Sequence, residues 1–441
     1  MFSKTKETEA SRMDAKIYTE SEFIQAMSDM FRAHASEAPS LIGVEFEHFL
    51  IDERTMRSYD YLEPDGQRDI FNTLSTMGWK IILKEGDNIL GLEKEGHTLT
   101  LEPGGQLEIS LGVLETYEEL DAAYQAVVGD LKKVLKSNQR LASIGYHPKS
   151  KIADLALLPK ERYKHMYTYF KDRGKYCHNM MKGTASTQVS IDYRDEADYR
   201  VKNRVAQFLS PILASLFDAT PLFEGSLYKG NNCRVSIWQH TDIKRSKILR
   251  GSFEDDFGFD AYGKYLLSLP PVILKSEGVF HYTEGETLQD LLPKYALDTS
   301  DFEHIQSMVF PDVRLKGFLE IRMADAMPYP YNLSIPMMIK AIFYDDTLLN
   351  KYDQMALKHG EAWVAKANDA ILTSVNPVVA GVNFATLKEE MLNDVMQVLP
   401  QRSYRPIMLL QSIVHESGSV KNWLSSLYSR DKEQFLKTIS L

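Results

Sequence analysis

Cysteine is scarce in this chain. Only Cys177 and Cys233 occur among its 441 residues. Two cysteines exclude a disulfide framework and suit a reducing compartment, so we expect a cytoplasmic protein. The sequence also lacks any run of about 18 apolar residues, which excludes a membrane-spanning helix of the usual length. The N-terminal residues are polar, and no secretory signal peptide is expected.

Two common nucleotide-binding motifs are also absent. The sequence contains neither the glycine-rich phosphate loop that ends in Gly-Lys-Ser/Thr nor the dinucleotide fingerprint. None of the eleven histidines shows the His-x-x-x-His spacing of a metal-binding helix. Any bound nucleotide would therefore have to be held mainly through metal ions and arginines.

Positive charge is in deficit. The chain has 51 basic and 61 acidic residues, which gives a net charge of −10. This balance argues against nucleic acid or an anionic membrane as the main partner and favours small-molecule ligands. It does not exclude a local phosphate site, because a bound metal ion can reverse the local sign of charge.

The sequence does have four short stretches that each predict a β-strand with one polar and one apolar face. These stretches are residues 43–50, 106–110, 184–192 and 318–323. Alternate residues of a strand point to the same side, so each polar set shares one face. Carboxylates placed together repel one another. A sheet built from these strands therefore predicts an acidic floor that needs cations for stability.

Strands interleaved with long helices predict an α+β fold, with an antiparallel sheet whose apolar face is covered by helices and whose polar face is left open as a cleft. Helices are expected over residues 19–35, 65–77, 114–137 and 196–217, and over nearly every segment from 335 onward. We expect three parts: a flexible leader at residues 1–17, a core at residues 18–345, and a helical C-terminal section at residues 346–441 that packs on the core.

Glutamates on the first two strands are candidate metal ligands. Glu45 and Glu47 share one face and could ligate a hard divalent cation, or they could simply face solvent on an outer strand. Glu102 and Glu108 flank the Pro103-Gly104-Gly105 turn. Glycine there would let the backbone approach a ligand closely, and a hairpin turn with incidental acids is the alternative.

The later strands offer hydrogen-bonding and charged candidates. Gln188 and Asp192 could bind a ligand from the third strand, or belong to a polar outer strand. Arg322 follows Glu320 by two residues, so the arginine could bind phosphoryl oxygens while the carboxylate holds a cation. A cross-strand salt bridge without chemistry is the alternative.

A dense polar stretch follows Cys233. Its Arg234 and Arg245 could clamp a carboxylate substrate, and a charged loop is the alternative. His48 is predicted to lie on the core side of its strand and to be structural. Both cysteines are also interpreted as structural.

These motifs together resemble the glutamate–cysteine ligases of the plant and proteobacterial type, which belong to the glutamine synthetase superfamily of carboxylate–amine ligases. The stretches that carry the resemblance are residues 43–47, 101–108, 159–163, 180–181 with 187–192, 237–245, 255–259 and 313–325. They occur in the expected order. The glycine-rich second stretch and the Glu320/Arg322 segment are the most specific.

The resemblance implies a sheet funnel that binds ATP as co-substrate and two or three Mg²⁺ ions, which Mn²⁺ could replace. Carried onto matching positions, it implies a metal site formed by Glu45, Glu47, Glu102, Glu108, Gln188 and Glu320. It implies catalytic roles for Glu320 and for Arg322, which would neutralise the transferred phosphoryl group. Substrate-binding residues would be Arg234, Arg245, Trp238, Gln106 and Asp192.

The implied reaction joins the γ-carboxylate of L-glutamate to the amine of L-cysteine through a γ-glutamyl phosphate. The product, γ-glutamylcysteine, is the first intermediate of glutathione biosynthesis. A monomer or homodimer is expected. The chain departs from the family at His48, where relatives tend to carry lysine, and at Ser190, where they often carry asparagine.

After Arg322 the chain carries Met323, Ala326 and Met327, where plant members are richer in glycine. A different amine acceptor, or a non-catalytic regulatory homologue, therefore remains an alternative. The two cysteines predict no redox control of the plant type.

Overall fold

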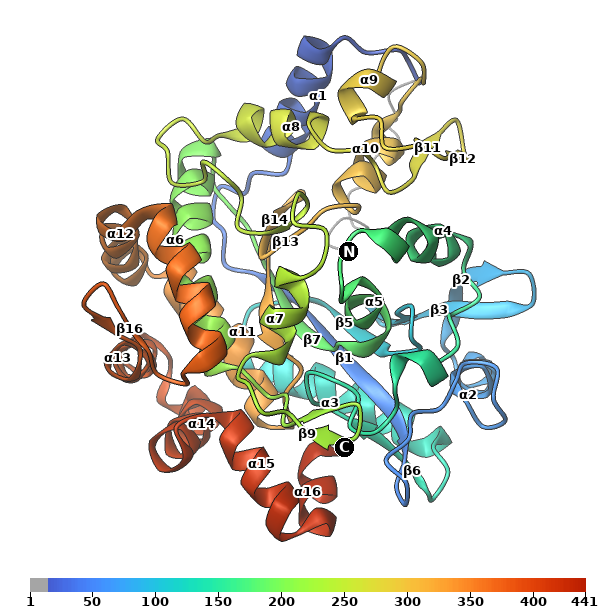
Figure 1. Ribbon diagram of the computed structural model, residues 1–441, viewed down its shortest axis with the longest axis vertical. Coiled ribbons are helices and arrows are strands. Elements are labelled where there is room, and N and C mark those ends of the chain that lie inside the picture. The colour runs from blue at the N-terminus through green and yellow to red at the C-terminus, as the bar shows by residue number, and fades with distance from the viewer. Residues whose placement is uncertain (1–14) are drawn as a thin grey trace.

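The computed structural model describes residues 15–441 (Figure 1). The predicted leader at residues 1–17 lies largely outside this part. Within it, Lys16 is already paired with Leu297: each backbone N–H donates to the other residue's carbonyl, at 3.2 and 2.9 Å.

One large sheet organises the fold. Its strands run in the order β14-β15-β7-β1-β5-β4-β3-β2, with β6 beside β1. All neighbouring pairs of this sheet are antiparallel, which confirms the predicted α+β class. The bounds are β1 (Ile42–Asp52), β2 (Lys80–Glu85), β3 (Asn88–Lys94), β4 (His97–Leu101), β5 (Leu107–Leu114), β6 (Gln139–Ala142), β7 (Ser186–Ile191), β14 (Val313–Leu315) and β15 (Leu319–Asp325).

Helices precede, interrupt and follow these strands. They are α1 (Glu20–Ala33), α2 (Gln67–Thr76), α3 (Tyr117–Val134), α4 (Glu161–Tyr169), α5 (Cys177–Gly183), α6 (Glu196–Leu216), α7 (Cys233–Gln239), α8 (Phe259–Leu267), α9 (Leu288–Leu291), α10 (Thr299–Gln306), α11 (Ser334–Tyr344), α12 (Asp346–Thr373), α13 (Phe384–Val398), α14 (Tyr404–Ser417), α15 (Val420–Arg430) and α16 (Lys432–Ile439). Among the described residues, none of them has both the length and the apolar character needed to cross a bilayer.

Short strand pairs complete the structure. They are β8 (Leu222–Phe223) with β9 (Ser226–Leu227), β10 (Ser246–Lys247) with β13 (Phe310–Pro311), β11 (Leu274–Ser276) with β12 (Val279–His281), and β16 (Val378–Val379) with β17 (Val382–Asn383). The β10–β13 pair is parallel, and it joins segments more than 60 residues apart.

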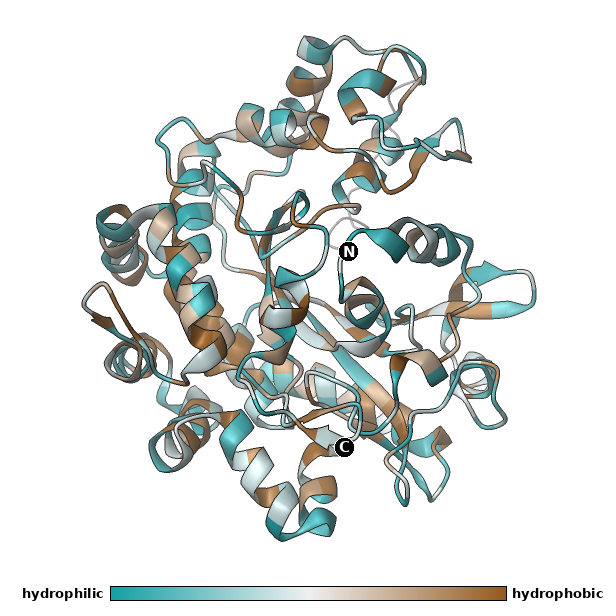
Figure 2. Ribbon diagram, viewed as in Figure 1, coloured by the Kyte–Doolittle hydropathy of each residue, from teal (hydrophilic) through white to brown (hydrophobic). Residues whose placement is uncertain are grey.

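The apolar strand faces are buried under helices, as predicted. Val44, Phe46 and Leu50 of β1 are buried, and the Phe46 ring lies 4.8 Å from the Tyr124 ring of α3. Helix α3 packs on β5, and α11 packs on β1 and β7. Figure 2 shows polar and apolar segments alternating along α12, as expected for an amphipathic helix that covers a core.

The helix predicted at residues 114–137 begins later than expected. Leu114 still pairs with Ile42 as part of β5. Helix α3 starts after Thr116, whose hydroxyl accepts from the Glu119 N–H while the Glu119 side chain accepts from the Thr116 N–H. This capping box fixes the start of the helix. The alternating apolar residues before it, Leu107, Ile109 and Leu111, belong to strand β5.

Helix α6 connects the sheet to the C-terminal helices. It packs against β15 on one side and α12 on another, and its residues 202–216 are all buried. The buried Lys388 amine of α13 reaches α6, where it donates to the Ser215 hydroxyl at 2.7 Å, and it also donates to the Asn376 side chain at 3.0 Å. Helix α12 is kinked at Gly360, whose φ is +69°.

Candidate active site

Strand pairing brings the predicted carboxylates together. Glu47 lies directly opposite Glu108 in the β1–β5 pair, and Glu45 lies opposite Gln188 in the β1–β7 pair. Opposed residues of antiparallel strands point to the same face. All four side chains line one pocket of about 300 Å³, which we call the main pocket.

Glu102 reaches the main pocket from the turn after β4. Its N–H donates to the Gln106 carbonyl at 2.9 Å, and Gly105, with a φ of +80°, donates to the Glu102 carbonyl at 2.8 Å. A Cβ atom on Gly104 would lie 2.4 Å from the Lys182 carbonyl oxygen. The turn therefore needs glycine twice, once for its φ and once for its close approach to another segment.

Gln106 lines the main pocket, but its amide group is already engaged. Its Oε1 accepts from the Gly104 N–H at 2.9 Å, and its Nε2 donates to the Thr184 carbonyl at 2.8 Å. The side chain thus fastens the glycine turn to the start of β7. The structure gives Gln106 this structural role, and its contact with substrate stays a prediction because it also lines the main pocket.

Six basic side chains share the main pocket with the carboxylates: Lys160, Arg162, Arg234, Arg314, Lys316 and Arg322. They come from the start of α4 and the residue before it, from α7, and from the β14–β15 hairpin. Roles were predicted from sequence only for Arg234 and Arg322. The sequence did contain a signal for Arg314 and Lys316, because they alternate with the apolar Val313 and Leu315. In the structure Arg314 lies opposite Glu320 across β14 and β15.

Glu320 lies beneath the main pocket and is fully buried. Its carboxylate meets Arg314 Nε at 2.7 Å, Lys316 Nζ at 2.8 Å and Arg322 NH1 at 2.6 Å. Burial opposes ionisation, yet these three cations hold the pKa of Glu320 well below its usual range. Glu320 was predicted to be a metal ligand. In the structure it is the shared counter-ion of three pocket cations.

Arg322 links three strands. One of its guanidinium nitrogens donates both to Glu320 and to the side-chain carbonyl of Gln188, and Gln188 Nε2 donates to Glu47 Oε1 at 3.2 Å. Glu47 also accepts from the Ser186 N–H at 2.7 Å. A row of hydrogen-bonded side chains therefore crosses β15, β7 and β1. It fixes the orientation of Arg322 relative to the acidic side of the main pocket, which is formed by Glu45, Glu47, Glu102 and Glu108.

The carboxyl groups of the acidic side disfavour one another's ionisation. Burial, reinforced by Glu108 and Glu320, raises the pKa of Glu45 to about 7. Burial, reinforced by Glu102 and Glu108, raises the pKa of Glu47 to about 8. As these side chains stand, no three carboxylate, histidine or cysteine groups in residues 15–441 converge on one point where they could chelate an ion. The raised pKa values nevertheless mark a place where a cation would be stabilised.

Asp192 and Arg245 lie outside the main pocket, contrary to prediction. Strand β7 ends at Ile191, so the alternation of faces does not extend to Asp192, whose N–H donates to the Tyr344 hydroxyl at 2.8 Å. The buried Arg245 guanidinium donates to Asp242 at 2.8 Å and to two backbone carbonyls. Neither residue is placed to bind a substrate in this pocket.

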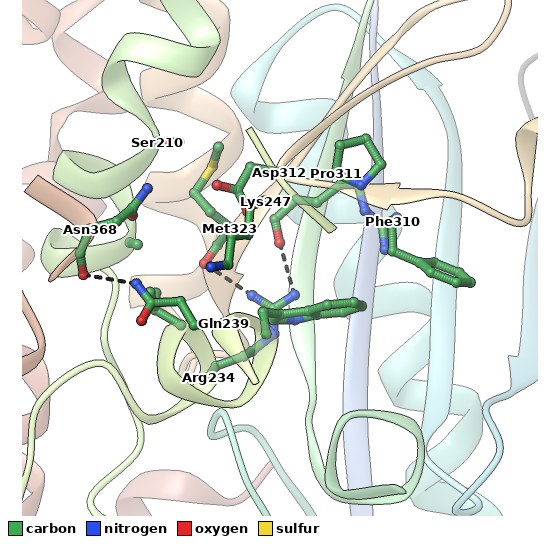
Figure 3. Close-up of a pocket in the computed structure, with 13 residues that line it drawn as sticks. Ser210, Arg234, Gln239, Lys247, Phe310, Pro311, Asp312, Met323 and Asn368 are labelled. Carbon is green, nitrogen blue, oxygen red and sulfur yellow. Dashed lines mark hydrogen bonds between the residues drawn. The ribbon is translucent and has the colours of Figure 1, made fainter. Parts of the chain in front are cut away.

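Arg234 and Trp238 of α7 stand where the main pocket meets a smaller one of about 40 Å³, which we call the side pocket. Figure 3 shows residues from α6, α7, α12 and the β10–β13 region around it. Arg234 donates to the backbone carbonyls of Met323 at 3.0 Å and Arg322 at 2.9 Å. Both residues line both pockets, and their contact with substrate remains a prediction.

His48 and the two cysteines lie away from the chemistry. His48 is buried on the core side of β1 and shares a 2.9 Å hydrogen bond with the Tyr124 hydroxyl. Burial lowers the pKa of His48 to about 4, so the ring is neutral near neutral pH. Cys177 and Cys233 are both free and buried. These observations agree with the structural roles predicted for all three.

Solved structures of distant proteins share this fold. A glutamate–cysteine ligase from Francisella tularensis, determined in complex with AMP, aligns with a TM-score of 0.54 at 10% identity, over 92% of this chain and 88% of that one. A bifunctional glutathione synthetase from Pasteurella multocida aligns with a TM-score of 0.50 at 12% identity, over 95% of this chain and 54% of that one. At these identities the likeness concerns the fold.

Sequence comparison is more specific. The chain is 29% identical to glutamate–cysteine ligase A, chloroplastic, of Oryza sativa subsp. japonica, over 84% of this chain and 77% of the relative. It is 32% identical to the chloroplastic glutamate–cysteine ligase of Arabidopsis thaliana, over 70% of this chain and 60% of the relative. Residues 41–376 match the profile of glutamate–cysteine ligase family 2 (GCS2). The chain therefore belongs to glutamate–cysteine ligase family 2, which confirms the resemblance of its motifs.

Proposed function

We propose that this protein joins the γ-carboxylate of L-glutamate to the amine of L-cysteine at the cost of one ATP and produces γ-glutamylcysteine. One observation carries the proposal: four glutamates and six basic side chains line a single pocket in a member of this family. A site with both signs of charge suits a reaction in which a phosphoryl group passes between two anions.

The acidic side would hold magnesium, and manganese could use the same ligands. Glu45, Glu47, Glu102, Glu108 and Gln188 offer carboxylate and amide oxygens, the donors that hard cations prefer. The raised pKa values of the four glutamates fit such a role, because a cation would remove their mutual repulsion. Glu320 could join this set only by sharing its oxygens with the cations it now binds. When bound, the ions would supply Lewis-acid polarisation of phosphate oxygens.

The protein's own residues contribute mainly position and charge. In the first step an oxygen of the γ-carboxylate attacks the terminal phosphorus of ATP; an O–P bond forms and the P–O bond to ADP breaks. Arg322, held by Glu320 and Gln188, is placed to stabilise the charge on the phosphoryl oxygens. Arg314 and Lys316 add positive charge on the same side of the pocket.

In the second step the amine of cysteine attacks the carbonyl carbon of the acyl phosphate. A C–N bond forms, the C–O bond to phosphate breaks with departure of inorganic phosphate, and the nitrogen releases a proton to solvent. Holding the two reactants together in a pocket of this kind converts a bimolecular encounter into a local one.

The cytosol remains our proposed compartment, because both cysteines are free. A monomer or homodimer remains our proposed assembly.

The test is a product assay. The purified protein is incubated with Mg²⁺, ATP and L-glutamate, with and without L-cysteine, and both ADP and product mass are measured. We expect cysteine to stimulate ADP release and to yield a product with the mass of γ-glutamylcysteine. Stimulation by another amine, with none by cysteine, would identify a different acceptor. If calorimetry detects no binding of Mg–ATP, the chain is a non-catalytic homologue.

A further inference from the structure

A third pocket lies in the C-terminal helical section, between α13 and α14. We call it the C-terminal pocket. Glu389 and Leu392 line it from α13, and Val414, His415 and Glu416 line it from α14. Its volume is about 520 Å³, and among residues 15–441 it shares no lining residue with the main pocket or the side pocket. Ligand pockets usually enclose about 300–1,000 Å³, so the space is sufficient for a small organic molecule.

The charge of the C-terminal pocket is negative. Glu389 and Glu416 line it, and within the described part of the chain neither carboxylate has an ion-pair or hydrogen-bond partner. No lysine or arginine of residues 15–441 lines this pocket, and His415 is the remaining ionisable group on its wall. The buried Lys388 amine donates to the Asn376 side chain of the wall at 3.0 Å and is thus already paired. Unpaired carboxylates in a hollow attract a positively charged ligand.

The C-terminal pocket also offers apolar and neutral polar surface. Leu392 and Val414 contribute apolar side chains, and Gln411 and Ser412 contribute amide and hydroxyl oxygens. The two carboxylates come from different helices, one from α13 and one from α14. A ligand that contacts both walls would therefore need positive charge at more than one place and hydrocarbon elsewhere.

We propose that the C-terminal pocket binds a linear aliphatic polyamine, with one ammonium group beside Glu389 and another beside Glu416. An ammonium group donates charge-assisted hydrogen bonds to a carboxylate, and the methylene groups between the charges can pack on Leu392 and Val414. Spermidine is a triamine of this kind with ten non-hydrogen atoms. It needs roughly 300 Å³ if each atom takes the volume of about 30 Å³ that a water occupies in the liquid, which is less than the pocket offers.

Other classes of ligand match the C-terminal pocket less well. ATP and glutamate carry net negative charge, so both carboxylates would repel them. A bare metal ion is disfavoured, because no three carboxylate, histidine or cysteine groups of residues 15–441 converge where they could chelate it. The C-terminal pocket is therefore no second substrate site, and the inference does not depend on the proposed function.

Calorimetric titration with spermidine tests the inference. We expect saturable binding of one spermidine per wild-type chain. The uncharged 1,8-octanediol has the same number of non-hydrogen atoms and should show no saturable binding. Glu389→Gln and Glu416→Gln should each weaken spermidine binding about threefold to fivefold, because each removes one ion pair at an exposed position.

Two further variants control for charge and for the main pocket. Glu390 is the next residue on α13 and is also exposed, but it does not line the C-terminal pocket. Glu390→Gln removes the same charge as Glu389→Gln and should change the dissociation constant for spermidine by less than about twofold. Glu108→Gln should also leave it within about twofold, although carboxylates of the main pocket could attract an amine. Thermal melting of each variant checks folding.

Four results would overturn the inference. The first is no saturable binding to the wild type up to about 10 mM spermidine. The second is equal weakening by Glu389→Gln and Glu390→Gln, which would mean diffuse attraction to a chain of net charge −10. The third is loss of binding in Glu108→Gln alone, which would place the amine in the main pocket. The fourth is equal affinity for 1,8-octanediol, which would mean that charge is not recognised. The two wild-type titrations need no variant.

Discussion

Glu47 and Glu108 lie directly opposite each other across β1 and β5. Like charges at opposed positions of an antiparallel pair are destabilising. Glu47 is nearly inaccessible to solvent, so water cannot relieve the repulsion. The protein therefore keeps a local instability at the centre of its main pocket, where a bound cation would remove it.

Substitution Glu108→Gln should stabilise the metal-free protein. The glutamine oxygen can still accept from the Thr100 and Ser110 hydroxyls, while the repulsion with Glu47 is lost. We expect a gain of about 1 kcal/mol in the free energy of unfolding in the presence of a chelator, and a smaller stabilisation by Mg²⁺ than in the wild type. Urea unfolding with and without Mg²⁺ measures both. Glu93→Gln on β3 is the matched control, and an unchanged Mg²⁺ effect in Glu108→Gln would contradict the metal assignment.

Substitution Glu320→Gln should impair both stability and turnover. A neutral amide would leave Arg314, Lys316 and Arg322 without their shared counter-ion. We expect the free energy of unfolding to fall by about 3 kcal/mol and turnover to fall by about a hundredfold or more. Denaturant unfolding and steady-state kinetics at saturating Mg²⁺ measure the two effects. Wild-type turnover in this variant would show that the orientation of the three cations is irrelevant to the reaction.

The location of the acidic residues could be predicted from sequence because polar residues at every second position are a local signal of strand faces. The pairing order β15-β7-β1-β5 is not local. No sequence pattern showed that Gln188 would stand opposite Glu45, or that Glu320 would lie beneath the pocket among three cations.

Polar residues outside regular strands were harder to place. Asp192 fits the alternation predicted for residues 184–192, but it lies just beyond the end of β7, so the alternation does not fix the direction of its side chain. Arg245 lies in a loop and has no such period. Lys160 and Arg162 flank the first residue of α4, ahead of Tyr163 and Met166, the buried residues that mark the apolar face of this helix. Family resemblance marked the segment that contains them, but it did not assign them a role.

Substitution Gly104→Ala should distort the turn that carries Glu102. The added Cβ would lie 2.4 Å from the Lys182 carbonyl oxygen and 2.8 Å from its Cα atom, so the backbone has to move. We expect a loss of about 2 kcal/mol in the free energy of unfolding, and weaker binding of Mg–ATP measured by calorimetry. Gly129→Ala in α3 is the control. Its Cβ would meet nothing within 4 Å, so we expect a gain of about 0.5 kcal/mol. Equal effects of the two substitutions would refute the close-approach argument.

Acid should destabilise the protein partly through His147. Its Nε2 donates to the Lys182 carbonyl at 2.8 Å, so its Nδ1 accepts from the Ser58 hydroxyl at 2.5 Å, and the ring is neutral. Burial lowers the pKa of His147 to about 4. In the unfolded chain an ordinary histidine takes up its proton near pH 6.5. Between these values only the unfolded state is protonated, so stability falls as the pH falls.

The loss attributable to His147 should approach about 3 kcal/mol by pH 4. Urea unfolding at pH 7, 6 and 5 measures the slope for the wild type and for His147→Gln, which cannot titrate. We expect the variant to be less stable at pH 7 and to show a shallower dependence on pH, by roughly one proton. Parallel slopes for the two proteins would mean that His147 takes up its proton at the same pH in the folded and the unfolded state.

The burial of α6 on several sides has a consequence for engineering. Residues 202–216 touch the catalytic sheet on one side and the helices after residue 345 on another, and Lys388 ties α13 to the end of α6. A shortened chain that stops at residue 345 would expose one flank of this helix to water and leave the Ser215 region without its lysine. Any minimal enzyme cut from this sequence would thus need an equivalent apolar cover in place of residues 346–441, because trimming alone would yield an aggregating fragment.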